Sequence, residues 1–228
     1  DLNPKAKKNI DGIIKRISTT SNASKMNKML DECKNLILGL GFVETDAHMK
    51  FLQQSLGGFG VNDFTKAWFS IKRVWASKFN ERAFLATKKL GVNLNQIFMA
   101  VLVQKIIPSE YAYVIHTTNP TNSNLDEVYA EACVGLGEAL VGDFPGMAMA
   151  FSFNKNTAQC KLNSYPSKSV GLHSEGFIFR SDSNSEDLPG FAGAGLFDSY
   201  TMNKEKKFRV SYKNEKLLMD QSYREAFM

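Results

Sequence analysis

One stretch of the sequence concentrates residue types that can hold a charged ligand. Residues 179–195 read FRSDSNSEDLPGFAGAG, where an arginine, hydroxyls and carboxylates precede a run with three glycines. Arg180 can direct two parallel N–H donors at phosphate oxygens, and glycines let backbone amides approach the same oxygens closely. The stretch therefore predicts an anion site. An ordinary polar loop, in which Arg180 pairs with Asp182 or Glu186, is the equal alternative.

A second glycine pattern and three glutamates offer weaker signals. Residues 135–142 read GLGEALVG, which is typical of a turn from a strand into a helix and could also approach a ligand. Glu127, Glu131 and Glu138 could bind ribose hydroxyls or Mg²⁺, because hard cations prefer carboxylate oxygens. Solvated surface carboxylates are the simpler interpretation of the three.

The histidines and cysteines predict no metal site and no disulfide framework. The histidines share no spacing with one another or with a cysteine, and the cysteines are odd in number and far apart. A reducing compartment fits this cysteine usage best. The residues are His48, His116, His173, Cys33, Cys133 and Cys160.

Composition favours a globular protein and argues against nucleic-acid and membrane partners. The 228 residues are 43% hydrophobic, enough for a sizeable core, and the formal net charge is +5. Lysine and arginine are scattered without a nucleic-acid recognition motif, so we expect an anionic small ligand and no nucleic acid. The most apolar run, 97–103, is too short to cross a membrane, and we expect no membrane partner.

Hydrophobic periodicity divides the chain into a helical first part and a strand-rich second part. Apolar residues recur at helical spacing over 10–17 and 29–40, and a helix over 64–80 is expected with Asn62 or Asp63 as its cap. A glycine-rich break at 56–60 suggests a boundary near residue 60. Strands are expected in five β-branched or aromatic runs: 97–107, 111–117, 128–134, 148–153 and 177–179.

Turn chemistry predicts how two of these strands connect. Pro108, Ser109 and Glu110 lie between the runs 97–107 and 111–117. Such residues favour a turn, so the two runs are expected to form an antiparallel pair.

Five long motifs in register closely resemble the α-glucan water dikinases of starch metabolism. They cover most of residues 61–212, whereas the first sixty residues match only as a helical lead-in. The motifs read IKRVWASKFNERAF (71–84), MAVLVQKIIPSEYAYVIHTTNP (99–120), EVYAEACVGLGEALVGDFPG (127–146), YPSKSVGL (165–172) and FRSDSNSEDLPGFAGAGLFDSY (179–200).

The motifs are also similar, more distantly, to pyruvate phosphate dikinase and phosphoenolpyruvate synthase. In those proteins the Arg-Ser motif precedes the Trp-Ala-Ser and Val-Gln segments, whereas here it follows them. This order favours the glucan dikinase branch. The alternatives are an ATP-binding domain like that of pyruvate phosphate dikinase or phosphoenolpyruvate synthase, and a non-catalytic nucleotide-binding scaffold.

The resemblance implies an α+β, ATP-grasp-like nucleotide-binding fold, with an antiparallel sheet and flanking helices. On this view residues 1–60 are a helical segment and residues 61–228 are a nucleotide-binding domain that is incomplete at its C-terminus. The terminal acidic strand and the Gln-Thr-Arg segment of the family, which supply metal ligands and a second phosphate arginine, have no match before Met228. The chain alone is therefore expected to be inactive, with metal ligands unknown.

The implied reaction transfers the β-phosphate of ATP to a histidine on another domain and then to a glucosyl unit, releasing AMP and phosphate with Mg²⁺ required. The partners would be ATP, an α-glucan and that phosphohistidine domain, in a plastid or the cytoplasm. Carried over by motif, the ATP contacts are Arg180, Ser181, Gly193, Gly195 and Lys168 at the phosphates, Gln104 at the adenine, and Glu131 and Glu138 at the ribose or adenine.

Overall fold

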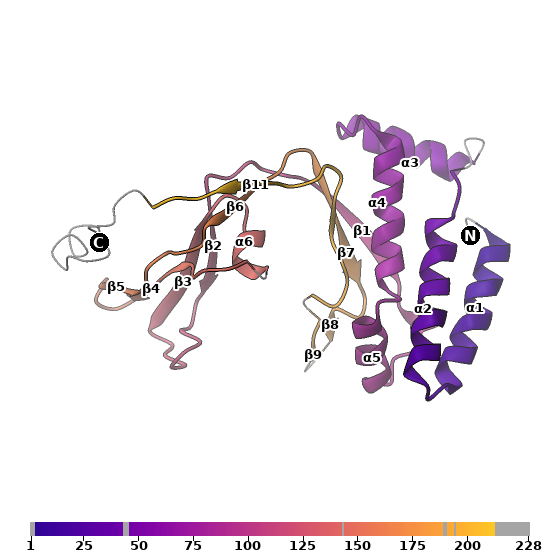
Figure 1. Ribbon diagram of the computed structural model, residues 1–228, viewed down its shortest axis with the longest axis horizontal. Helices are drawn as coiled ribbons and strands as arrows, with labels where there is room; N and C mark the ends of the chain where they lie inside the picture. The colour runs from indigo at the N-terminus through magenta and orange to yellow at the C-terminus, as the bar shows by residue number, and fades with distance from the viewer. Residues whose placement is uncertain (1–2, 43–45, 143, 189–190, 194, 213–228) are drawn as a thin grey trace. The chain divides into compact units, whose positions relative to one another are not determined.

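The computed structural model describes residues 3–42, 46–142, 144–188, 191–193 and 195–212. The chain forms two compact units, and each of them contains a separate antiparallel sheet. Unit 1 comprises residues 1–106 and 176–203, and unit 2 comprises residues 107–175 and 204 onward. The chain therefore enters unit 2 after β1 and returns to unit 1 for the arginine-containing strand β7 (Figure 1).

Unit 1 begins with five helices, and polar caps set the starts of the first four. Asn3, Asn22, Asp46 and Asp63 each accept a hydrogen bond from a backbone amide in the first turn of the helix that follows. The cap at Asp63 confirms one of the two predicted alternatives. The helices are α1 (Pro4–Thr19), α2 (Ala23–Leu38), α3 (Ala47–Gly58), α4 (Phe64–Ser77) and α5 (Glu81–Lys89).

The sheet of unit 1 pairs strands that lie far apart in the sequence. A short 3-10 helix, η1 (Leu94–Gln96), precedes β1 (Met99–Lys105), and all seven residues of β1 pair with β7 (Phe177–Ser183). On the other side of β7 lies β10 (Tyr200–Thr201). Between β7 and β10 the chain forms a small hairpin of β8 (Asp187–Leu188) and β9 (Phe191–Ala192).

Helix α4 packs on one face of this sheet and builds the core of unit 1. Its predicted apolar face is confirmed, since Ala67 and Val74 are fully buried and Trp68 is 5% exposed. From β7, Phe179 enters the same cluster with no exposed surface. The indole of Trp75 donates a hydrogen bond to the carbonyl of Met99 at 3.1 Å, which ties the helix to β1.

Unit 2 is built on a four-stranded sheet in the order β2-β3-β4-β5. Beside it, β6 pairs with β11, and the short helix α6 (Glu138–Val141) packs with β2, β3 and β6. Helix α6 follows Gly135, whose positive φ of 86° and contact with the backbone of Leu172 require glycine, so the turn predicted for residues 135–142 is confirmed. The strands are β2 (Tyr111–His116), β3 (Glu127–Val134), β4 (Met149–Asn154), β5 (Cys160–Ser164), β6 (Val170–His173) and β11 (Lys206–Arg209).

The α+β class and the antiparallel sheets with flanking helices are confirmed, and each of the five predicted strand runs overlaps a strand. The predicted pairing of the first two strand runs is wrong, because β1 pairs with β7 and β2 pairs with β3. Residues 106–110 instead carry the chain from one unit to the other, and the amide of Ile106 donates to the carbonyl of Gly176 at 2.8 Å.

The boundary near residue 60 stays a prediction. Met49 and Leu56, which precede it, share a buried cluster with Val61 and Trp68, which follow it. Within the described part of the chain, no helix is both long and apolar enough to cross a membrane.

Candidate functional site

Arg180 lies on the face of the unit 1 sheet opposite the buried cluster. Along β7, Phe177 and Phe179 point toward α4, and the two-residue alternation of a strand turns Arg180 the other way, where it is exposed. Its guanidinium donates a long hydrogen bond, 3.5 Å, to the side-chain oxygen of Gln104 on β1. A contact of that length is weak, so both groups can reorient toward a ligand.

Ser181 and Arg180 project to opposite faces of the sheet. Ser181 is paired with Val101, which packs in the cluster beneath α4, whereas Arg180 is paired with the exposed Leu102. A ligand that contacts the Arg180 guanidinium therefore meets a different face from the one that carries the Ser181 hydroxyl. The predicted contribution of Ser181 to phosphate binding stays a prediction.

The two glycines predicted to support the phosphates have different surroundings. The amide of Gly193 donates to the carbonyl of Glu186 at 2.7 Å, and a Cβ at this position would lie 2.5 Å from that carbonyl oxygen. Gly193 is therefore required by close packing, and its amide already has a protein acceptor. Gly195 is exposed at a φ of 75°, which a residue with a side chain adopts only at a cost. Residues 189–190 and 194 lie outside the described residues.

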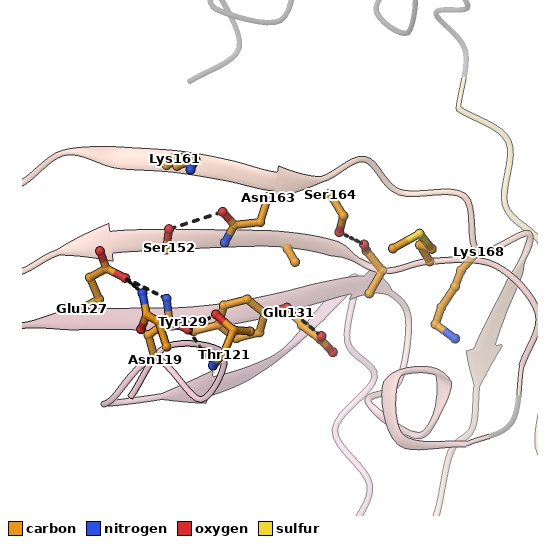
Figure 2. Close-up of a pocket in the computed structure, with 14 residues that line it drawn as sticks. Asn119, Thr121, Glu127, Tyr129, Glu131, Ser152, Lys161, Asn163, Ser164 and Lys168 are labelled. Carbon is orange, nitrogen blue, oxygen red and sulfur yellow. Dashed lines mark hydrogen bonds between the residues drawn. The ribbon is translucent and has the colours of Figure 1, made fainter. Parts of the chain in front are cut away.

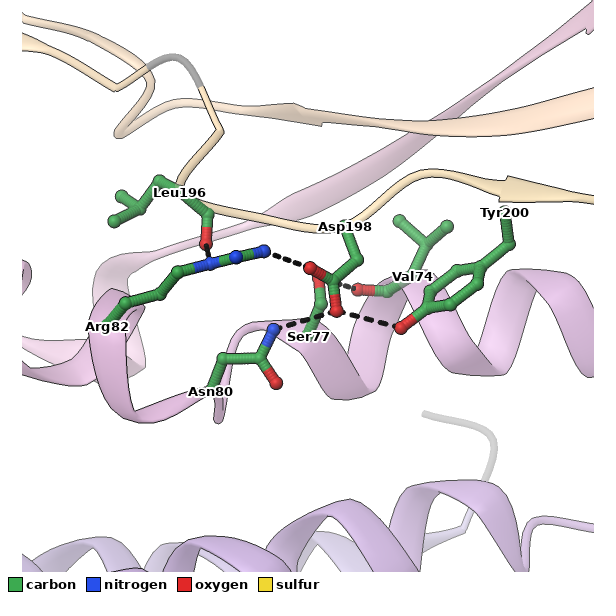
Figure 3. Close-up of polar contacts among 7 residues, drawn as sticks. All are labelled: Val74, Ser77, Asn80, Arg82, Leu196, Asp198 and Tyr200. Atoms are coloured by element: carbon green, nitrogen blue, oxygen red, sulfur yellow. Dashed lines mark hydrogen bonds and ion pairs between the residues drawn. The ribbon is translucent and has the colours of Figure 1, made fainter. Parts of the chain in front are cut away.

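The end of the arginine motif contacts Asn80, which lies between α4 and α5, and Arg82, which lies on α5 (Figure 3). Asp198 accepts hydrogen bonds of 2.8 Å from Asn80 and from Tyr200, and it forms an ion pair with Arg82. Arg82 also donates through Nε to the carbonyl of Leu196 at 3.1 Å. These contacts join two of the motifs, FNERAF and GLFDSY, and fix the chain just after Gly195.

Tyr200 is partly buried in this cluster. Burial and the neighbouring Asp198 carboxylate raise the pKa of the Tyr200 phenol to about 12, because both disfavour the phenolate. The guanidinium of Arg73 lies 3.8 Å from the centre of the Tyr200 ring and opposes that rise. Asp198, Arg82 and Asn80 were not predicted as functional, since residues more than a hundred positions apart give no local sequence signal.

Unit 2 contains a polar cavity of about 590 Å³ on one face of its sheet (Figure 2). Alternate residues of β3 point into it, and Glu127 is held at one end by the amide groups of Asn119, at 2.7 Å, and Asn122, at 3.2 Å. These donors favour the carboxylate and lower the pKa of Glu127. Ser152 and Asn163 line the same cavity from β4 and β5.

Glu131 lies farther along the same cavity. The hydroxyl of Tyr129 donates to Oε1 of Glu131 at 3.1 Å, and burial together with this carboxylate raises the pKa of Tyr129. Lys168 also lines the cavity, yet only 8% of it is exposed, and its ammonium donates to the carbonyl of Phe144 at 2.8 Å. The cavity thus combines carboxylates, a buried cation and hydroxyls, which together suit a ligand with both hydroxyl and phosphate groups.

The structure therefore brings Arg180 and Gln104 together in unit 1, and Glu131 and Lys168 together in unit 2. Glu138 is exposed at the start of α6 and is not among the described residues that line the cavity. Across the described part of the chain, no three His, Cys, Asp or Glu side chains lie close enough together to hold a metal ion.

The three histidines occupy unrelated places in the described structure. His48 contacts its neighbour Asp46, and His173 contacts Glu175 at 3.3 Å. His116 lies beside the ring of Tyr129. None of these settings assigns a role to a histidine in the chemistry.

Comparisons with known proteins cover most of the chain. The family described as "Pyruvate phosphate dikinase, AMP/ATP-binding domain" matches residues 9–170. The alpha-glucan water dikinase of Solanum tuberosum, named as chloroplastic, is 47% identical over 174 residues, and alpha-glucan water dikinase 2 of Arabidopsis thaliana is 49% identical over 163 residues. These alignments cover 75% and 71% of this chain but only 12% and 13% of the relatives' own length.

A more distant relative is the phosphoenolpyruvate synthase of Pyrococcus furiosus, which is 38% identical over 71 residues, 31% of this chain and 9% of its own. The similarity to α-glucan water dikinases and the more distant similarity to phosphoenolpyruvate synthase, which the motifs predicted, are both confirmed. The chain belongs to the pyruvate phosphate dikinase AMP/ATP-binding domain family.

Proposed function

We propose that this chain is the ATP-binding region of an α-glucan water dikinase. The whole enzyme would transfer the β-phosphate of ATP to a histidine on another domain and then to a glucosyl unit of a starch-like glucan, releasing AMP and phosphate. The observation that carries the proposal is the exposed Arg180–Gln104 pair, which lies within two of the motifs that resemble α-glucan water dikinases.

The role of Arg180 follows from its position on a paired strand. Phosphoryl transfer requires the phosphates to be positioned and their charge to be neutralised, and a forked guanidinium does both. Seven pairs of residues along β1 and β7 hold the strand, so the arginine starts from a fixed backbone. Gln104, beside it, would contact the adenine or the nearest phosphate, and Gly195 would let the backbone approach the ligand.

Within unit 2, Glu131 and Lys168 are proposed as ATP-binding residues. The carboxylate of Glu131 would accept hydrogen bonds from ribose hydroxyls, and Lys168 would exchange its carbonyl partner for a phosphate oxygen. The proposal also includes Glu138, Ser181 and Gly193 as ATP-binding residues. Glu138 is not among the described residues that line the cavity, Ser181 projects to the face opposite Arg180, and the amide of Gly193 donates to the carbonyl of Glu186.

Magnesium would enter this reaction as the complex with ATP. The described residues do not gather the carboxylates of a dedicated metal site, so no step proposed here depends on a metal held by this chain. A plastid location is proposed from the names of the chloroplastic relatives.

The proposal is tested on the full-length protein with ATP that carries a radioactive β-phosphate. Incubation with solubilised starch should label the glucan and release AMP, and the labelled histidine of the intermediate should map to a peptide outside residues 1–228. A protein that instead labels pyruvate would belong with the phosphoenolpyruvate synthases. ATP binding without any transfer would indicate a nucleotide-binding scaffold.

A further inference from the structure

The backbone amides of two glycines in the arginine motif differ in their availability to a ligand. The amide of Gly193 already donates to the carbonyl of Glu186 at 2.7 Å. Gly195 is exposed, its φ is 75°, and no described residue accepts a hydrogen bond from its amide. A backbone N–H that is open to solvent at a left-handed residue is a typical contact for an anion. Of the two glycines, Gly195 is therefore the one that can donate to a phosphate.

The residues that directly follow Gly195 are buried in unit 1. The side chains of Leu196 and Phe197 enter the cluster that also contains Phe79. The amide of Leu196 donates to the carbonyl of Gly193 at 3.0 Å. The chain thus passes from an exposed glycine into the core within one residue, so the position of Leu196 helps to determine where the Gly195 amide lies.

One guanidinium holds this segment at two points (Figure 3). Arg82, on α5, donates through Nε to the carbonyl of Leu196 at 3.1 Å and forms an ion pair with Oδ1 of Asp198. The guanidinium is planar and rigid, so the two contacts also fix the carbonyl and the carboxylate relative to each other. The other carboxylate oxygen of Asp198 accepts hydrogen bonds of 2.8 Å from Asn80 and from Tyr200. Both ends of the segment 196–198 are therefore attached to α5 through the same side chain.

The same segment is attached to the strand that carries Arg180. Tyr200 pairs directly with Phe179, the residue before Arg180, in the antiparallel pairing of β10 with β7. The hydroxyl of Tyr200 in turn donates to the carboxylate of Asp198. The segment that Arg82 holds is therefore also fixed relative to Arg180.

The ion pair of Arg82 with Asp198 is too exposed to be a main source of stability. The side chain of Arg82 is 56% exposed, and that of Asp198 is 27% exposed. Ion pairs at such positions contribute little to the free energy of unfolding, because water screens the charges. The loss of Arg82 alone should therefore have a larger consequence for the position of the segment beside Gly195 than for the stability of unit 1.

We propose that Arg82 and Asp198 are positioning residues for the phosphates of ATP. Arg82 would act through the carbonyl of Leu196 and the carboxylate of Asp198, and would keep the Gly195 amide directed at the phosphates that Arg180 binds. Neither Arg82 nor Asp198 would touch the nucleotide itself. The inference rests on the proposed ATP-binding function and adds two residues that determine the geometry of its site.

The test compares the affinities of the full-length protein for ATP and for adenosine by calorimetric titration. Arg82→Gln should weaken ATP binding about tenfold, because a small misplacement of a binding group is costly, and should change adenosine binding less than about twofold. Arg82→Lys keeps the charge but cannot make both contacts, so it should lose about as much affinity for ATP. Asp198→Asn should also weaken ATP binding, and combining it with Arg82→Gln should weaken binding no further than the stronger single change, because the two residues act as a unit.

Two controls separate this effect from a loss of charge and from a loss of stability. Arg16→Gln makes the same chemical change at an exposed position of α1 and should leave the affinity for ATP unaltered. Ile17→Val removes one carbon from a fully buried side chain, so it should lower the midpoint of urea unfolding and still leave the affinity for ATP unaltered.

Four results would overturn the inference. Unchanged ATP affinity in both Arg82→Gln and Arg82→Lys, with far-UV circular dichroism showing a folded protein, would remove Arg82 from the site. Affinity that Arg82→Lys alone retains would show that the charge matters and the two-point contact does not. Equal losses for ATP and adenosine would show that the changes do not act on the phosphates. A wild-type protein that binds no ATP would refute the proposed function, and this inference with it.

Discussion

In each unit, candidate ligand-binding side chains lie on one face of a sheet. The two sheets differ in how far the opposite face is covered by other residues. In unit 1, α4 packs on the face opposite Arg180, and the described residues form clusters of 16 and 9 buried side chains. In unit 2, the face opposite Glu131 keeps Tyr113 and Ile115 more than half exposed, and the described cluster contains three buried side chains. Unit 1 therefore has a much larger hydrophobic core among the described residues than unit 2.

This difference separates two kinds of contribution to function. A residue that points to the covered face acts through stability, whereas a residue on the open face can act on a ligand. Phe179 and Arg180 are neighbours in sequence and illustrate the two cases, with 0% and extensive exposure respectively.

The largest loss of stability is expected from Phe179→Ala. Removing a fully buried aromatic side chain leaves a cavity beneath α4 and should lower the free energy of unfolding by about 4 kcal/mol. Urea unfolding followed by tryptophan fluorescence measures this, since Trp68 and Trp75 lie in the same cluster. Phe98→Ala is the control, because Phe98 is 70% exposed and its loss should change stability by less than about 0.5 kcal/mol. Equal effects would mean that α4 does not form the main core.

The largest loss of function is expected from Arg180→Ala. Loss of a charge-assisted contact to phosphate should weaken ATP binding or turnover in the intact enzyme by about 2 kcal/mol or more, with little change in stability. Calorimetric titration with ATP measures the affinity. Arg180→Lys keeps the charge but not the fork and should lose less, and Arg16→Ala, an exposed residue of α1, should lose nothing. Unchanged affinity in Arg180→Ala would remove Arg180 from the site.

A smaller loss of stability is expected from Asp198→Asn. The substitution weakens the ion pair with Arg82 and the hydrogen bond from Tyr200, and it should cost about 1 to 2 kcal/mol in the free energy of unfolding. Combining it with Arg82→Gln should cost less than the sum of the two single changes, because the residues interact directly. Additive losses would show that the contact contributes nothing. Asp31→Asn, at an exposed helical position, is the matched control.

The smallest expected effect is a dependence of stability on alkaline pH that comes from Cys33. Burial raises the pKa of this thiol from 9.0 to about 12, so the folded chain keeps the proton over a range in which the unfolded chain loses it. The contribution of the neutral thiol is complete below pH 9 and is lost as the pH rises from 9 toward 12. Urea unfolding of the wild-type chain and Cys33→Ala at pH 7 and pH 10 should show a narrower gap at the higher pH. A gap that widens would contradict the assignment.

Much of the fold follows from local sequence patterns. The helix over 64–77, its cap at Asp63 and the turn at Gly135 were predictable because each depends on residues within a few positions. The pairing of β1 with β7 was not predictable in this way, since 71 residues (106–176), which include most of unit 2, lie between the two strands. Pro108 correctly marked the end of a strand, but it could not show that the chain next enters another unit.

The candidate site shows the same difference between features that local sequence predicts and features that depend on long-range contacts. The motif around Arg180 was recognisable, and strand alternation would have placed Ser181 on the other face once the strand was extended beyond Phe179. The contact of Asp198 with Arg82 and Asn80 left no pattern in the sequence, because it depends on how the motif returns to α4 and α5. The cavity on the polar face of β3 likewise required the registers of three strand pairs.

The most direct test of ATP binding is a thermal-shift titration of this chain with ATP, with and without Mg²⁺. Binding to the native state raises the apparent stability by mass action, so a saturable, Mg²⁺-dependent rise in Tm that is lost in Arg180→Ala is the predicted result. An unchanged Tm at every ATP concentration would contradict the claim that residues 1–228 contain a working nucleotide site.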